Sequence, residues 1–180
     1  LYNIKVKMIK AALFDLDGVV FETESQYTIF WGMIGREYHP EMPDFAHRIK
    51  GQTLVQIYDK YFSDAQTFAH IEGFTSVAEE QAKITVRLDE YERNMAYNYV
   101  AGFEDFVKDL KKNGVKCAVV TSSNANKMSI VYECHPEYKT YFDKVLTSED
   151  LAKSKPDPDG LLKGAAYFDA KRQECVGLED

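Results

Sequence analysis

Side chains that could bind a metal ion or a phosphate occur at four places in the chain, three of them directly after a short apolar run and one in a loop further along. They are Asp15 with Asp17, Thr121 with Ser122, Lys155, and Glu179 with Asp180. Charges gathered in one place need partners, because two like charges about 4 Å apart repel by on the order of 4 kcal/mol at an effective dielectric of about 20. A divalent cation with oxygen ligands would hold such carboxylates together, and Mg²⁺ fits better than a thiolate-seeking metal. The pattern predicts a Mg²⁺ site if these places converge.

The elements that must position these groups alternate between strands and helices. Residues 11–14 are uniformly apolar and are followed at once by Asp15, which is typical of a strand buried on both faces of a parallel sheet. Further along, we expect a helix closed by Gly114, a strand at 115–120, a helix at 125–132, a strand at 142–146, a helix opened by Asp157 and Pro158, and a strand at 175–178. This α/β alternation predicts a doubly wound parallel sheet, whose ligands bind outside the carboxyl ends of the strands.

Residues 22–99 have the periodicity of helices. Three or four helices are expected there, with Thr53 as one N-cap and with Ser76 and Glu79 forming a capping box. The chain should therefore contain an α/β core made of residues 1–21 and 100–180, with residues 22–99 inserted as an all-helical domain. Residues 1–10 fit either an edge strand or an ordered tail.

Composition excludes some classes of partner. Among 180 residues, Lys and Arg number 22 against 29 Asp and Glu, and the net charge of -7 opposes unspecific attachment to nucleic acid or to anionic lipid. No signal peptide or membrane span is recognisable, so the cytoplasm is the expected compartment. The oligomeric state stays open, with a monomer favoured.

The charged groups lie in four short motifs that occur in a set order. These are Asp15-Leu16-Asp17-Gly18-Val19-Val20, Val119-Val120-Thr121-Ser122-Ser123-Asn124, Lys155-Pro156-Asp157-Pro158 and Val176-Gly177-Leu178-Glu179-Asp180. Taken alone, Asp-x-Asp after a strand is more often a turn or capping device. Together the four resemble the motifs of the haloacid dehalogenase superfamily. The helical insertion resembles that family's C1 cap, which implies a Rossmannoid core with an inserted cap domain.

The resemblance implies a role for each residue of the reaction. Asp15 would attack phosphorus to give an aspartyl-phosphate, and Asp17 would be the general acid and base. Thr121 and the backbone N–H of Ser122 would hold phosphoryl oxygens, and Lys155 would offset charge between Asp15 and the phosphate.

The resemblance also implies the ligands of the cofactor and a further phosphate contact. Asp15, Asp17 through its carbonyl, Glu179 and Asp180 would bind Mg²⁺. Gly18 is expected beside the phosphate. The substrate would be a small phosphorylated molecule, and dehalogenation is disfavoured because dehalogenases of the superfamily lack the second Asp of the first motif.

Within the superfamily, the motifs look like the β-phosphoglucomutase and small-phosphatase branch. Tyr27 and Leu54 stand where the mutase has a hinge His and a phosphate-gripping Arg. Both differences favour a phosphomonoesterase, with a sugar phosphate as one candidate substrate. A sugar-phosphate mutase and a silent phosphate-binding pseudoenzyme are the alternatives. A signalling receiver domain, which has a similar set of residues, is disfavoured by the long insertion. Related proteins continue beyond the fourth motif, so a C-terminal part of the core is expected to be missing.

Overall fold

The computed structural model describes residues 8–180, which form two compact units. One, the core unit, comprises the described residues up to Glu22 together with Tyr97–Asp180, and the other, the helical unit, comprises Thr23–Ala96. The expectation of a strand or tail at 1–10 falls largely outside the described residues, and residues 8–10 are not in a strand. Within residues 8–180, no helix is both long enough and apolar enough to cross a membrane.

A parallel sheet organises the core unit. Its strands are β1 (Ala11–Phe14), β2 (Lys116–Val120), β3 (Lys144–Leu146) and β4 (Cys175–Leu178), in the order β3-β2-β1-β4. In the register, Leu13 is paired with Ala118 on one side and with Gly177 on the other. The β1 side chains are at most 2% exposed, as expected for a strand covered on both faces. The predicted doubly wound sheet is therefore confirmed.

The helices of the core unit follow the strands in alternation. They are α5 (Phe103–Lys112), α6 (Ala125–Cys134), α7 (Tyr138–Tyr141) and α8 (Asp159–Tyr167), with short 3-10 turns η2 (Ser148–Asp150) and η3 (Arg172–Glu174). Strand β3 begins two residues later than predicted, because the side chain of Asp143 accepts the Cys117 N–H that a longer ladder would use. The other predicted boundaries agree within two residues.

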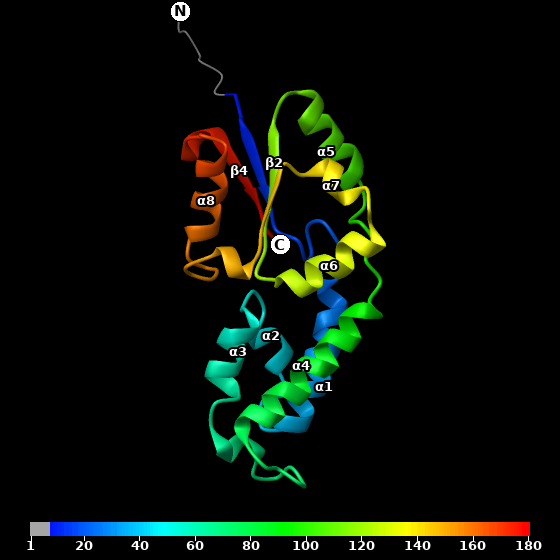
Figure 1. Cartoon of the computed structure of the whole chain (residues 1–180), viewed down its shortest axis with the longest axis vertical. Coiled ribbons are helices and arrows are strands. Elements are labelled where there is room, and N and C mark those ends of the chain that lie inside the picture. The colour runs from blue at the N-terminus through cyan, green and yellow to red at the C-terminus, as the bar shows by residue number, and fades with distance from the viewer. Residues whose placement is uncertain (1–7) are drawn as a thin grey trace, which may run out of the picture. The chain divides into compact units, whose positions relative to one another are not determined.

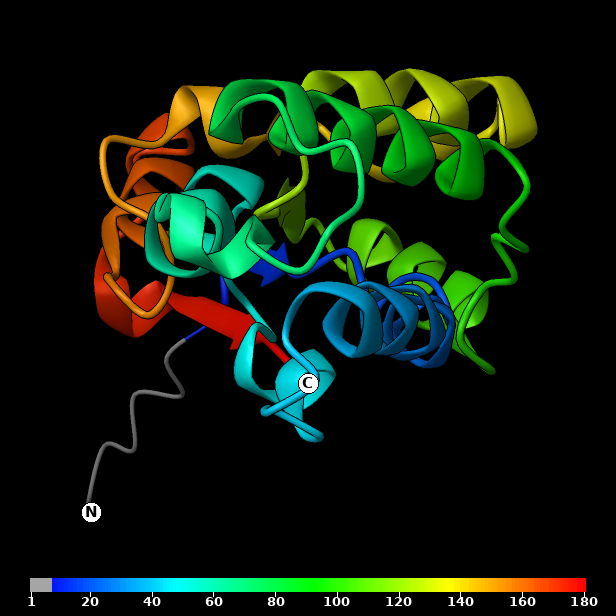
Figure 2. The ribbon, with the colours of Figure 1, turned by 90° about the horizontal axis from the view of Figure 1, so that it is seen from below.

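Two helices cover opposite faces of the sheet (Figures 1 and 2). On the α5 face, Phe14 contacts the rings of Phe103 and Phe142 edge-on. On the α8 face, Gly164 lies so close to the sheet that a Cβ there would come within 2.9 Å of Leu13. The absence of a side chain at this glycine lets α8 approach the strands.

The helical unit consists of α1 (Glu24–Tyr38), α2 (Phe45–Arg48), α3 (Leu54–Tyr61), the 3-10 turn η1 (Ala65–Phe68) and α4 (Val77–Arg93). Thr53 caps α3 in a complete capping box with Gln56. Ser76 caps α4 by accepting the Glu79 N–H, but the Glu79 carboxylate accepts a hydrogen bond from Thr75. The capping box predicted for α4 is therefore formed in one direction only.

Aromatic side chains fill the interior of the helical unit. This aromatic cluster includes Phe30, Trp31, Tyr38, Phe45, Phe62 and Phe68, together with Ile34, Ile49, Ile57, Ile84 and Leu88. Two glutamates are buried beside it. Glu80 accepts hydrogen bonds from the Tyr38 hydroxyl at 3.1 Å and the Lys83 ammonium at 2.7 Å, and Glu92 accepts one from the Tyr27 hydroxyl at 2.6 Å. These partners offset part of the cost of burying charge.

Candidate active site

Asp15 lies immediately after β1, between the neighbouring strands. Its N–H donates to the carbonyl of Leu178 at 2.8 Å, which continues the pairing of β1 with β4 by one residue. The carboxylate accepts the Leu16 N–H at 2.7 Å and lies 2.8 Å from the Lys155 ammonium. Burial raises the pKa of Asp15 to about 6, and the nearby Lys155 opposes that rise. The sheet thus holds a poorly solvated carboxylate at its carboxyl edge.

Lys155 connects the first and last motifs. Its ammonium lies 2.8 Å from Asp15 Oδ2 and 2.8 Å from Glu179 Oε2. The side chain of Lys155 is 18% exposed, so this charge is largely removed from water. A single cation therefore bridges two carboxylates that are distant in sequence, as the predicted convergence requires.

A second lysine, which the sequence reasoning missed, contacts Asp17. The Lys127 ammonium lies 2.6 Å from each carboxylate oxygen of Asp17. Ser123 Oγ donates to the same carboxylate at 3.2 Å and accepts from Lys127 at 3.1 Å. The side chain of Lys127 is only 2% exposed. One signal was available: Lys127 falls in the first turn of the predicted helix 125–132, where a positive charge is unfavourable.

The second motif forms a tight turn after β2. Thr121 is 1% exposed, and its N–H donates to the carbonyl of Leu146 at 3.0 Å. The Thr121 hydroxyl accepts the Ser123 N–H at 3.0 Å, which fixes the turn that carries Ser122. Asn124 then caps α6 by accepting the Lys127 N–H. The turn therefore places Ser123 against the first motif.

Gly18 and Asp180 bring the first and fourth motifs together. Gly18 has φ of +78°, and a Cβ at this position would lie 3.0 Å from Asp180 Cβ and 3.0 Å from its Oδ2. Only a residue without a side chain suits both the conformation and the close approach. The Asp180 carboxylate is thereby held against the loop that carries Asp15 and Asp17. The oxygen donors of this loop and of Asp180 are of the type that Mg²⁺ prefers.

The structure thus brings all four predicted places to one edge of the sheet. In the described part of the chain, no three His, Cys, Asp or Glu side chains form a metal-binding group by themselves. A cation at this edge would therefore also need backbone carbonyl and water oxygens, which is common for Mg²⁺. The roles of the individual residues stay predictions.

Comparison with known proteins gives the family. Residues 12–180 match the family model described as haloacid dehalogenase-like hydrolase, which spans all four motifs and the helical unit. The chain belongs to this family.

Relatives narrow the enzyme class. The chain is 27% identical to the β-phosphoglucomutase of Bacillus subtilis (strain 168) and 25% identical to the pyrophosphatase PpaX of Bacillus mycoides (strain KBAB4). Each alignment covers 96% of this chain and 75% of the relative. A crystal structure of β-phosphoglucomutase from Clostridium difficile superposes with a TM-score of 0.67 at 23% identity, covering 96% of this chain and 77% of that one. The fold is confirmed, and the relatives support the predicted class of phosphatase or phosphomutase.

Proposed function

We propose that the protein is a Mg²⁺-dependent phosphomonoesterase that acts on a small phosphorylated metabolite through an aspartyl-phosphate at Asp15. The observation that carries the proposal is the Asp15 carboxylate, held at the end of β1 by the Leu16 N–H and the Lys155 ammonium. A largely buried carboxylate fixed in this way is positioned to act as a nucleophile, since its orientation is set before substrate arrives.

In the first step, an oxygen of Asp15 forms a bond to phosphorus while the bond from phosphorus to the leaving oxygen breaks. Asp17 gives its proton to that leaving oxygen, so the product departs as a neutral alcohol. In the second step, water attacks the phosphorus of the aspartyl-phosphate, and Asp17 takes the proton of that water. Free phosphate is released, and the Asp15 carboxylate is regenerated.

The remaining groups of the site stabilise the phosphoryl group. The Thr121 hydroxyl and the Ser122 N–H are assigned to its oxygens, with Gly18 leaving room beside them. Lys155 is assigned to offset the negative charge of Asp15 and of the phosphate. Bound Mg²⁺ would neutralise negative charge that builds up on the transferring group. Its ligands would be Asp15, the Asp17 carbonyl and Asp180, with Glu179 contributing directly or through water.

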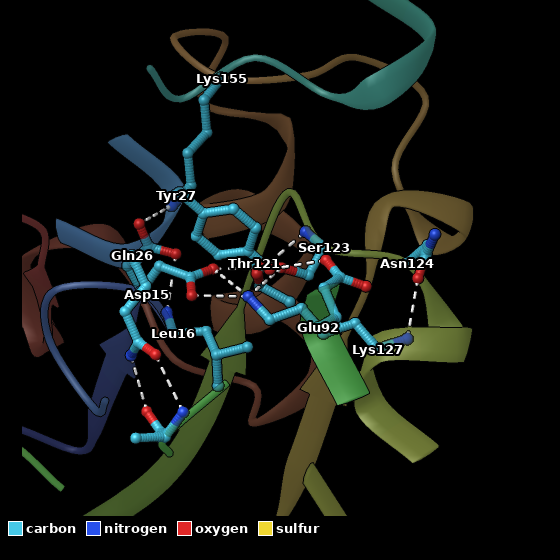
Figure 3. Close-up of polar contacts among 12 residues, drawn as sticks. Asp15, Leu16, Gln26, Tyr27, Glu92, Thr121, Ser123, Asn124, Lys127 and Lys155 are labelled. Atoms are coloured by element: carbon cyan, nitrogen blue, oxygen red, sulfur yellow. Dashed lines mark hydrogen bonds and ion pairs between the residues drawn. The ribbon is translucent and has the colours of Figure 1, made fainter. Parts of the chain in front are cut away.

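Two positions of the helical unit support hydrolysis over phosphoryl transfer to a second sugar hydroxyl. The Tyr27 hydroxyl donates to Glu92 at 2.6 Å (Figure 3). Tyr27 is a neutral residue where the mutase branch has a His. Leu54 is half-buried against the aromatic cluster and has no charge with which to grip a phosphate. The mutase stays the second candidate because the β-phosphoglucomutase of Bacillus subtilis is similar over 96% of this chain.

The test is phosphate release from sugar phosphates, nucleotides and an aryl phosphate, with and without Mg²⁺. Asp15→Asn keeps the shape of the side chain and removes the nucleophile, and Asp105→Asn, at an exposed position of α5, is the matched control. The expected result is Mg²⁺-dependent release that Asp15→Asn abolishes and Asp105→Asn retains.

Two other outcomes would overturn the proposal. Isomerisation of a sugar phosphate that depends on a bisphosphate activator would establish the mutase. A folded protein that binds phosphate compounds and releases phosphate from none of them would establish the pseudoenzyme.

A further inference from the structure

The Lys127 ammonium is the most deeply buried cation at the carboxyl edge of the sheet among the described residues. It contacts both oxygens of Asp17 at 2.6 Å and Ser123 Oγ at 3.1 Å. All three of its N–H groups therefore have an acceptor within hydrogen-bonding distance. The side chain of Asp17 stays 20% exposed, while that of Lys127 is 2% exposed. The lysine thus reaches the carboxylate from inside the protein and leaves part of Asp17 open to solvent.

A contribution to the stability of the fold does not by itself explain the ion pair of Lys127 with Asp17. Burying an ammonium costs several kcal/mol of hydration, and well-packed apolar residues often stabilise a fold as well as a buried ion pair does. The helix adds a further cost, because Lys127 lies in the first turn of α6, where the helix dipole disfavours a positive charge. Asn124 caps that turn through the Lys127 N–H and so fixes the lysine backbone. A cation at such a costly position indicates that Lys127 has a functional role at Asp17.

We propose that Lys127, assisted by Ser123, is the positioning residue that fixes the orientation of the Asp17 carboxyl group for proton transfer. Two donors reach Asp17, Ser123 from the second motif and Lys127 from the first turn of α6. The Thr121 hydroxyl fixes the turn that carries Ser123, and the Asn124 cap fixes the backbone of Lys127. A carboxyl group held in this way spends less time in orientations that cannot reach the leaving oxygen. The proposal rests on the phosphatase function proposed above.

The test compares two substrates that differ in their need for a proton. p-Nitrophenyl phosphate releases a stable phenolate and needs little help from an acid, whereas phenyl phosphate has the same frame and a much poorer leaving group. The ratio kcat/KM reports the steps up to release of that group. Lys127→Met is expected to lower kcat/KM for phenyl phosphate at least about 10-fold more than for p-nitrophenyl phosphate.

A double variant separates positioning from a general structural role. If Lys127 acts through Asp17, Lys127→Met should cause no further loss in an Asp17→Asn background. Lys116→Met is the matched control, because it removes a lysine 3.3 Å from Asp143 in the same unit, away from the four motifs. It should lower both kcat/KM values by the same small factor. Ser123→Ala, which removes the second donor, provides the same substrate comparison if Lys127→Met fails to fold.

Equal losses on the two substrates, or losses that multiply in the double variant, would overturn the positioning role while leaving the phosphatase in place. A wild-type protein that releases phosphate from neither substrate, and from none of the sugar phosphates and nucleotides of the first test, would instead overturn the proposed function and the positioning role together.

Discussion

Both units of the molecule bury charged side chains, but they do so in different ways. In the helical unit, Glu80 and Glu92 are each bound by a tyrosine hydroxyl beside the aromatic cluster. In the core unit, the buried charges come from separate segments of the chain and gather where parallel strands end. The first arrangement satisfies polar groups within a packed interior, and the second collects reactive groups at one edge. We therefore expect changes in the helical unit to affect stability first, and changes at the sheet edge to affect chemistry first.

The largest effect is expected from a substitution that disrupts the aromatic cluster. Phe62 is fully buried there, so Phe62→Ala should lower the free energy of unfolding of the helical unit by about 3–5 kcal/mol through lost burial and a cavity. Trp31 is the single tryptophan of the chain and belongs to the same cluster, so its fluorescence during urea unfolding reports on this unit. A Trp31 fluorescence transition at the same urea concentration as in the wild type would contradict the assignment of the cluster as the core of the helical unit.

The next effect concerns the lysine that bridges Asp15 and Glu179. Lys155→Met should lower kcat about 100- to 1,000-fold, because it removes a cation that stabilises charge at the phosphoryl group. Loss of this cation should also raise the pKa of Asp15 above about 6, so the acid side of the pH–rate profile should move to higher pH. Lys153→Met is the matched control, since Lys153 pairs with Asp157 in the same loop and is exposed. An equal loss of kcat in both variants would show that the lysine at the sheet edge matters no more to the reaction than an exposed lysine of the same loop.

A smaller effect is expected where the first and fourth motifs touch. Gly18→Ala places a residue with a Cβ in a left-handed conformation and pushes that Cβ against Asp180. Half-maximal activity should therefore need about 10-fold more Mg²⁺, which is equivalent to about 1.4 kcal/mol. Gly114→Ala carries the same conformational strain at φ of +77° with no atom within 4 Å of the added Cβ. Its Mg²⁺ requirement should match the wild type, and parallel behaviour of the two variants would contradict a role of the Gly18 contact in placing Asp180 at the Mg²⁺ site.

The smallest effect tests a buried charge in the helical unit. Tyr38→Phe removes a hydrogen bond to Glu80, which keeps its contact with Lys83, so the unfolding free energy should fall by about 1 kcal/mol. Phosphate release by the folded variant should stay within about twofold of the wild type. A large loss of activity without loss of stability would show that this buried charge also serves the chemistry.

Much of the fold and of the site could be predicted from local patterns. The run 11–14 is apolar and short, and the reactive groups follow strands at regular places, so parallel pairing alone implies that they meet. The capping box of α4 was predicted in both directions and forms in one, because Thr75 offers Glu79 a competing hydroxyl. Such competition between neighbours is decided by geometry that residue spacing does not contain.

Residue types within short windows were enough to predict the class of fold, the helical insertion and the acidic and basic residues of the four motifs. The partner that each charge takes depends instead on how the folded chain brings distant segments together. Lys127 is 110 residues from Asp17 along the chain, and Lys155 is shared by Asp15 and Glu179. Such pairings depend on strand order and on the turn after β2, which bring distant segments within hydrogen-bonding distance and bury them from water.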